Sequence, residues 1–133
     1  MDYVKRTYNE VKGTFDFALT YKNIFTTYEM LGVNTKGLWL WLNFGAKPLG
    51  FFEWKWIKEI LVSQKDEAVY IVMYDMQSII DNVILGAKWY FKDLYVCKQS
   101  NGDLAIGLAM NYDISRILGY IVDQELAKVI SIE

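Results

Sequence analysis

The chain has 133 residues, of which 53% are hydrophobic and 17% aromatic, and its 14 basic and 16 acidic residues leave a net charge of -2. This composition is typical of one globular domain, residues 1–133, and argues against disorder. Histidine is absent and Cys97 is the lone cysteine, which excludes histidine-based triads, most zinc sites and an intramolecular disulfide. No basic run suggests nucleic-acid binding, and no apolar stretch has the length of a membrane-spanning helix.

The N-terminal segment is predicted to form one amphipathic helix over residues 2–30. The apolar residues that recur there three or four positions apart are Val4, Tyr8, Val11, Phe15, Ala18 and Tyr21. Gly13 interrupts the pattern and permits a bend, and Gly32 follows the last apolar pair as a C-terminal stop.

The middle of the chain changes to strand-like patterns. Two apolar runs, 38–44 and 51–57, predict strands joined by a turn that contains glycine and proline. A third run, 68–74, is continuously apolar and rich in β-branched and aromatic residues, as expected of a central strand. Helical spacing returns over 76–91, with Asp75 placed as the N-cap.

The asparagine–glycine dipeptide at 101–102 predicts a hairpin. It stands between apolar runs at 94–99 and 103–110, and a type I′ turn requires two residues that tolerate positive φ. A two-residue turn also fixes the register, in which Cys97 faces Ile106.

A last amphipathic helix is predicted to begin at the capping residue Asp113 and to carry apolar residues as far as Val129. The polar residues along it are Asp113, Arg116, Asp123 and Lys128. Because this polar stripe is narrow, we expect the helix to be buried on two sides. The candidate interface residues on it are Tyr120, Ile121 and Leu126.

These elements predict an α+β fold, with a mainly antiparallel sheet and helices at both chain ends. The alternative is an all-α four-helix bundle, in which 66–98 and 103–131 are two long helices. The hairpin dipeptide and the continuous apolar runs favour the sheet.

Four tryptophans form the main candidate binding site: Trp39, Trp41, Trp54 and Trp56. If the runs 38–44 and 51–57 pair with Phe44 opposite Phe51, Trp41 falls opposite Trp54 and Trp39 opposite Trp56. All four indoles then lie on one face of two strands. Either the N-terminal helix covers this face as core, or the face is a stacking platform for a planar ligand, a sugar or a partner protein.

Few residues suggest catalysis. Glu53 and Lys55 have the spacing of metal-dependent nucleases, but such sites need a second carboxylate, and the neighbouring strand offers Asn43. The acids expected near strand ends are Asp75, Asp81, Asp103 and Asp113, which read more simply as helix caps and turn residues. Cys97 is expected to be a small buried hydrophobe. We therefore expect no enzyme activity, no metal and no cofactor.

The C-terminal third, a hairpin that leads into an amphipathic helix, resembles the corresponding part of roadblock and profilin-type domains. The resemblance covers residues 93–130 and is one of architecture, without a shared diagnostic motif. Those domains are small, non-enzymatic modules that dimerise or dock onto other proteins, and the resemblance implies such a role here.

The expected function is therefore protein–protein interaction. The surplus of aromatic residues (10 Tyr, 7 Phe and 5 Trp) predicts contact with a second copy of the chain, as a homodimer or larger homo-oligomer, or with an unidentified partner protein. The polar N-terminus and lone cysteine predict a cytoplasmic, intracellular protein. The composition also fits an inhibitor or virion component of a virus or mobile element. The alternatives are a small-ligand-binding protein that uses the tryptophan face and a small metal-dependent hydrolase or nuclease.

Overall fold

The computed structural model describes residues 4–5, 10–11, 28–42, 47–74, 97–99 and 101–132. Over these residues the chain forms two β-sheets and one α-helix, which confirms mixed α+β content. The alternative of a four-helix bundle is wrong, because strands lie at Ala68–Met73 and Leu104–Ala109, inside the two segments that it required to be long helices. The helix predicted near 76–91 lies outside the described residues.

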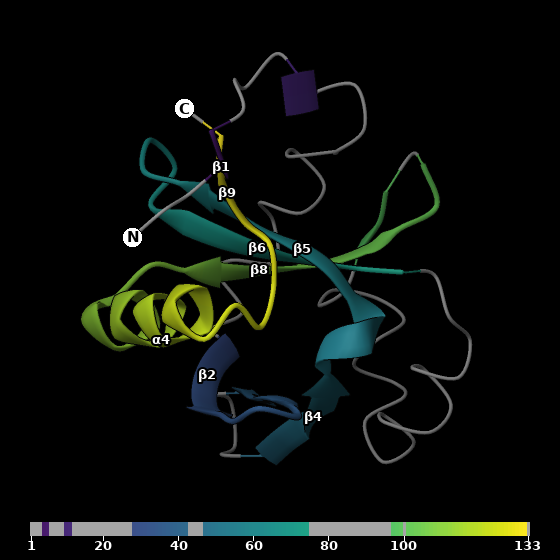
Figure 1. Cartoon of the computed structure of the whole chain (residues 1–133). Coiled ribbons are helices and arrows are strands. Elements are labelled where there is room, and N and C mark those ends of the chain that lie inside the picture. Colours follow the sequence, from purple (N-terminus) through teal and green to yellow (C-terminus); the bar gives the residue numbers. More distant parts are fainter. Residues whose placement is uncertain are drawn as a thin grey trace.

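The larger sheet has six described strands in the order β1-β9-β5-β6-β8-β7. In that order the strands are Val4–Lys5, Val129–Ser131, Ile57–Ser63, Ala68–Met73, Leu104–Ala109 and Cys97–Lys98. β9 runs parallel to both of its neighbours, β1 and β5, whereas the other pairings are antiparallel. The first described strand thus lies beside the last one, as Figure 1 shows.

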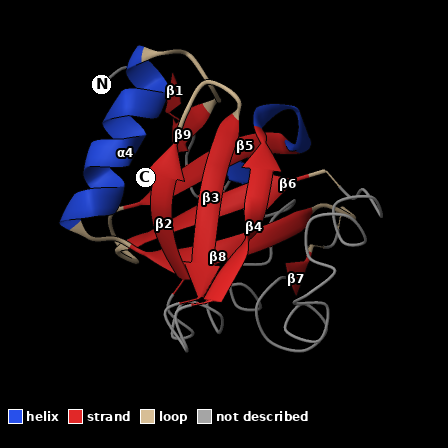
Figure 2. Cartoon of the chain, turned by 90° about the horizontal axis from the view of Figure 1, so that it is seen from below, coloured by secondary structure: helices blue, strands red, loops and turns tan. Residues whose placement is uncertain are grey.

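The smaller sheet is an antiparallel meander of β2 (Tyr28–Val33), β3 (Gly37–Leu42) and β4 (Lys47–Glu53). A short 3₁₀ helix, Trp54–Trp56, joins β4 to β5 of the larger sheet. The helix α4, Tyr112–Asp123, lies beside β2. Figure 2 shows α4 and the smaller sheet side by side as one layer in front of the larger sheet.

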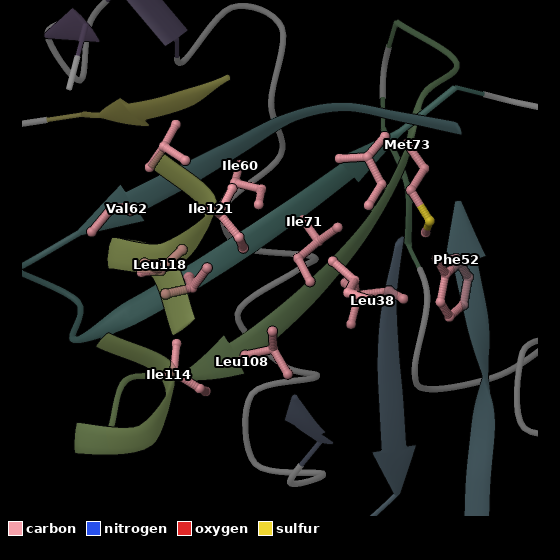
Figure 3. Close-up of a cluster of buried hydrophobic side chains, with 14 of the residues drawn as sticks. Leu38, Phe52, Ile60, Val62, Ile71, Met73, Leu108, Ile114, Leu118 and Ile121 are labelled. Atoms are coloured by element: carbon pink, nitrogen blue, oxygen red, sulfur yellow. The ribbon is translucent and has the colours of Figure 1, made fainter. Parts of the chain in front are cut away.

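A hydrophobic core lies between this layer and the larger sheet. Leu38 and Phe52 are fully buried and point from the smaller sheet toward the larger one, where Ile71 and Met73 belong to the same cluster (Figure 3). The side of α4 that faces the sheet contributes Ile114, Leu118 and Ile121. The opposite face of the larger sheet is also buried and has its own cluster: Val11, Leu61, Ala68, Tyr70, Val72, Ala105, Ile130 and Ile132. Burial on both faces explains why β6 is apolar throughout.

The prediction of one helix over residues 2–30 is wrong at both of its ends. Val4–Lys5 is strand β1, and β2 begins at Tyr28. Inside the predicted span Glu10 and Val11 are helical, and residues 6–9 and 12–27 lie outside the described part of the chain. β1 is a strand because it pairs with β9 near the other end of the chain, and β2 because it pairs with β3, which follows it directly. A periodicity of apolar residues within one segment does not contain that information.

The last helix also differs from its prediction. Asn111, not Asp113, is the N-cap, and its side-chain oxygen accepts a hydrogen bond of 2.8 Å from the Ile114 amide. The helix ends at Asp123, because Glu125 adopts a positive φ of 54° and the Leu126 amide donates to the Ile121 carbonyl at 3.0 Å. This geometry is a Schellman C-cap, formed here without glycine. The chain then continues into strand β9 rather than extending the helix to Val129.

The predicted hairpin at 101–102 is present, but its register is wrong by one residue. Cys97 pairs with Ala105 rather than Ile106. Gly102 has a positive φ of 94°, whereas Asn101 does not, so the turn is not type I′. The Gly102 amide donates to the Gln99 carbonyl at 2.9 Å, which gives a three-residue loop and shifts the pairing.

Candidate functional site

The four predicted tryptophans do not form one face. The strands at 38–44 and 51–57 were expected to pair Trp39 with Trp56, but Trp39 pairs with Phe51 and Trp41 with Pro48. Strand β4 begins at Lys47 and ends at Glu53, so Trp54 and Trp56 lie beyond it in the 3₁₀ helix. The alternating pattern of aromatic and charged residues in this segment therefore belongs to a strand end and a helical turn.

Trp54 and Trp56 have structural contacts. The Trp54 indole Nε1 donates a hydrogen bond of 2.9 Å to the Asn34 carbonyl, which ties the β2–β3 turn to the 3₁₀ helix. The Trp56 carbonyl accepts a hydrogen bond of 3.1 Å from the Tyr74 amide at the end of β6. Both side chains are partly buried and pack against the core cluster. They are accordingly part of the junction between the two sheets.

Trp39, in contrast, lies on the outer face of the smaller sheet. Its side chain is 43% exposed, although its neighbour Leu38 is fully buried on the inner face. The Trp39 ring packs against Phe51 on β4, with centroids 4.9 Å apart and an interplanar angle of 51°. Such tilted aromatic pairs are favourable beyond their buried area. We call this pair, the exposed Trp39 and the partly buried Phe51, the Trp39 face.

Two glycines bring the rings of the Trp39 face close to the backbone. A Cβ atom on Gly32 would lie 3.4 Å from Cδ1 of Trp39, so the indole extends over this glycine of β2. A Cβ atom on Gly37 would clash with the Phe52 carbonyl oxygen and lie 2.9 Å from Cζ of Phe51. Gly37 is therefore required by close approach of the backbone of β4. The two glycines can be seen in the sequence, but their contacts with the rings depend on the register in which β3 pairs with β2 and β4.

Trp41 lies two positions further along β3, where it pairs with Glu29 and Pro48. Its side chain lies outside the described part of the structure. Pro48 has no amide hydrogen, which is typical of an edge strand such as β4.

The outward side of α4 carries a second group of exposed aromatic residues. Tyr112 is 80% and Tyr120 39% exposed. Arg116 lies between them at helical spacing and is exposed, so the three side chains share one side of the helix. We call them the α4 stripe. The Arg116 guanidinium is 3.8 Å from the Asp113 carboxylate, and both groups are largely exposed.

The structure assigns different positions to the three predicted interface residues. Tyr120 is exposed on the α4 stripe, but Ile121 is fully buried in the core. Leu126 is partly buried and packs against the same cluster, as the C-cap motif requires. Within the single chain the outward side of the helix is exposed from Tyr112 to Tyr120, so burial of a second side stays a prediction about contact with another molecule. Phe51 and Tyr112, which belong to the two aromatic groups, were not predicted from the sequence as surface residues.

Charged groups in the described residues form ion pairs rather than a catalytic cluster. Glu53 and Lys55, the candidate nuclease pair, lie 3.6 Å apart and are exposed. The Lys58 ammonium donates to Asp103 at 2.7 Å, and this hydrogen bond raises the pKa of Lys58 above its ordinary value. Among the residues that the structure describes, no three acidic or cysteine side chains gather in a way that could hold a metal ion. Asp75 and Asp81 lie outside those residues, as does the side chain of Cys97.

No helix in the described part of the chain has both the length and the apolar character needed to cross a membrane. Comparison of the sequence and structure with protein-family models, curated proteins and solved structures found no match.

Proposed function

We propose that the protein is a non-enzymatic interaction module that associates with a second copy of itself through the outer surface of the smaller sheet and α4. The observation that carries this proposal is the exposure of Trp39. Its indole is nearly half exposed and packs on a second aromatic ring, Phe51.

The residue types on this surface support the proposal. Tryptophan, tyrosine and arginine are the side chains that most often dominate the binding energy of protein interfaces. The Trp39 face contributes a tryptophan, and the α4 stripe contributes Tyr112, Arg116 and Tyr120. Burial of the exposed area of large aromatic side chains in an interface stabilises the complex.

The two groups belong to one layer of the molecule. Strand β2 lies between the Trp39 face and α4, and it packs beside the helix. In Figure 2 this layer is turned toward the viewer, with the larger sheet behind it. A single partner surface could therefore contact both groups, and the near-neutral charge of -2 gives only weak repulsion between copies.

Sedimentation velocity over a range of protein concentrations tests the proposal. We expect a dimer or larger assembly for the wild-type chain and a shift toward monomer for Trp39→Thr. Threonine suits a strand, so this variant removes the exposed ring with little effect on folding. Tyr74→Ala is the matched control, because Tyr74 is 45% exposed but lies at the end of β6, outside the proposed surface. A wild-type chain that stays monomeric at high micromolar concentration, or equal effects of the two substitutions, would contradict self-association.

The two alternative functions predict different results. If Trp39 is a platform for a small planar ligand, members of a ligand panel should quench tryptophan fluorescence in the wild-type chain and not in Trp39→Thr. If the chain is a metal-dependent hydrolase, Mg²⁺ or Mn²⁺ should support cleavage that Glu53→Gln abolishes. The exposed contact between Glu53 and Lys55 gives no support to that second alternative.

A further inference from the structure

The tip of the β7–β8 hairpin contains an asparagine whose side chain has a structural role. Asn101 is exposed, and its Oδ1 atom accepts a hydrogen bond of 2.9 Å from the Asp103 amide. Its Nδ2 atom donates to Asp103 Oδ2 at 3.1 Å. The same Asp103 oxygen accepts a hydrogen bond of 2.7 Å from Lys58 on β5. Asn101, Asp103 and Lys58 thus form a network, which we call the hairpin latch, between the hairpin tip and β5.

The residue after Asn101 makes this amide chemically reactive. An asparagine side chain is attacked by the backbone nitrogen of the following residue, and a side chain on that residue hinders the attack. Gly102 has no side chain, and even a Cβ atom placed there would have no neighbouring atom within 4 Å. Steric hindrance from a side chain at position 102 is therefore absent.

We propose that Asn101 is a site of spontaneous deamidation and that its conversion weakens the hairpin latch. The Gly102 nitrogen loses its proton and forms a bond to Cγ of Asn101. The side-chain nitrogen of Asn101 takes up a proton and leaves as ammonia, which gives a five-membered succinimide. Water then hydrolyses either of the two imide C–N bonds and leaves aspartate or isoaspartate at position 101. No oxidant, metal or enzyme takes part.

The hydrogen bonds of the folded turn oppose this reaction. The Gly102 amide donates to the Gln99 carbonyl at 2.9 Å, and the Gln99 amide donates to the Asp103 carbonyl at 2.7 Å. The turn must open before Gly102 attacks. Within the described residues, strand β7 comprises Cys97–Lys98, directly before this turn. Local opening of this kind requires much less free energy than global unfolding.

Both products disturb the latch. Aspartate replaces the Nδ2 donor with a carboxylate oxygen, which is then placed against the carboxylate of Asp103. Like charges at hydrogen-bonding distance repel, and the two groups compete for Lys58. Isoaspartate in addition lengthens the main chain within the turn that the Gly102–Gln99 hydrogen bond closes.

The site is tested by incubating the folded protein at mildly alkaline pH and mapping its peptides by mass spectrometry that separates aspartate from isoaspartate. Asn34 and Asn111 are internal controls, because they are followed by Thr35 and Tyr112. We expect Asn101 to convert well before both, though more slowly than in a synthetic peptide of residues 97–105. An unchanged Asn101 after the peptide has fully converted, or earlier conversion of a control asparagine, would overturn the assignment.

The effect on the latch is tested separately by amide hydrogen exchange. In Asn101→Asp, which mimics one product, we expect the Gln99 and Gly102 amides to exchange several-fold faster than in the wild-type chain. Asn101→Ser is the matched control, because it keeps an oxygen acceptor for the Asp103 amide without adding a charge. Equal exchange rates in Asn101→Asp and the wild-type chain would show that conversion leaves the latch intact.

Discussion

Two consecutive residues of β3, Leu38 and Trp39, allow the two faces of the smaller sheet to be tested separately. Leu38 is fully buried in the cluster that joins the two sheets. Replacing a buried leucine with alanine removes apolar contacts and leaves a cavity, which costs about 3 kcal/mol. Unfolding entropy scales with chain length, so for 133 residues this loss lowers the melting temperature by roughly 11 °C. We expect Leu38→Ala to show this loss.

Trp39→Thr is the matched control for Leu38→Ala. Because 43% of the Trp39 surface is already exposed, we expect a loss of under about 1 kcal/mol in the free energy of unfolding of the monomer. Urea unfolding followed by far-ultraviolet circular dichroism, at concentrations low enough for a monomer, measures both changes. Equal losses for the two substitutions, or a loss of less than about 1 kcal/mol for Leu38→Ala, would refute the assignment of inner and outer faces.

Three further predictions concern helix caps and one ion pair. Asn111→Ala should destabilise the protein by about 1 kcal/mol in urea unfolding, and Asp113→Ala by clearly less, because Asn111 makes the capping hydrogen bond. Glu125→Gly should stabilise it by roughly 0.5–1 kcal/mol, because glycine tolerates the positive φ at this C-cap; a lower melting temperature would contradict this. Because Asp103 raises the pKa of Lys58 in the folded state, the stability from this pair is present below the ordinary lysine pKa of 10.5 and is lost as pH rises through the raised value. Melting temperatures across alkaline pH should therefore fall more steeply for the wild-type chain than for Lys58→Met, and parallel curves would count against the pair.

Several strands could be predicted from the sequence because their signals are local. The continuous apolar run at 68–74 predicts β6, and the run at 103–110 predicts β8. Both strands are central and buried on two faces, so their continuous apolar composition is enough to predict a strand. The Asn101–Gly102 dipeptide likewise predicts a turn. The register of the two strands, however, differs between a loop of two residues and one of three. The loop length depends on the backbone angle of Asn101.

The remaining differences arise from distant contacts. The strand character of Val4–Lys5 depends on β9 at the other end of the chain. The position of Trp54 depends on a carbonyl twenty residues away, in Asn34. For the candidate site, the sequence identified Trp39 and Tyr120 as aromatic surface candidates. It could not separate them from Trp54, Trp56 and Ile121, because exposure is decided by the register of β3 with β4 and by the side of α4 that faces the sheet.

Hydroxyl-radical footprinting at low and high protein concentration tests most directly whether copies associate through the Trp39 face and the α4 stripe. Oxidation of the exposed aromatic side chains reports their access to solvent, and Tyr74 provides an internal control outside the proposed surface. We predict that oxidation of Trp39 and Tyr112 falls as the concentration rises, whereas that of Tyr74 stays constant. Unchanged oxidation of Trp39 over a concentration range in which the protein associates would contradict the proposal.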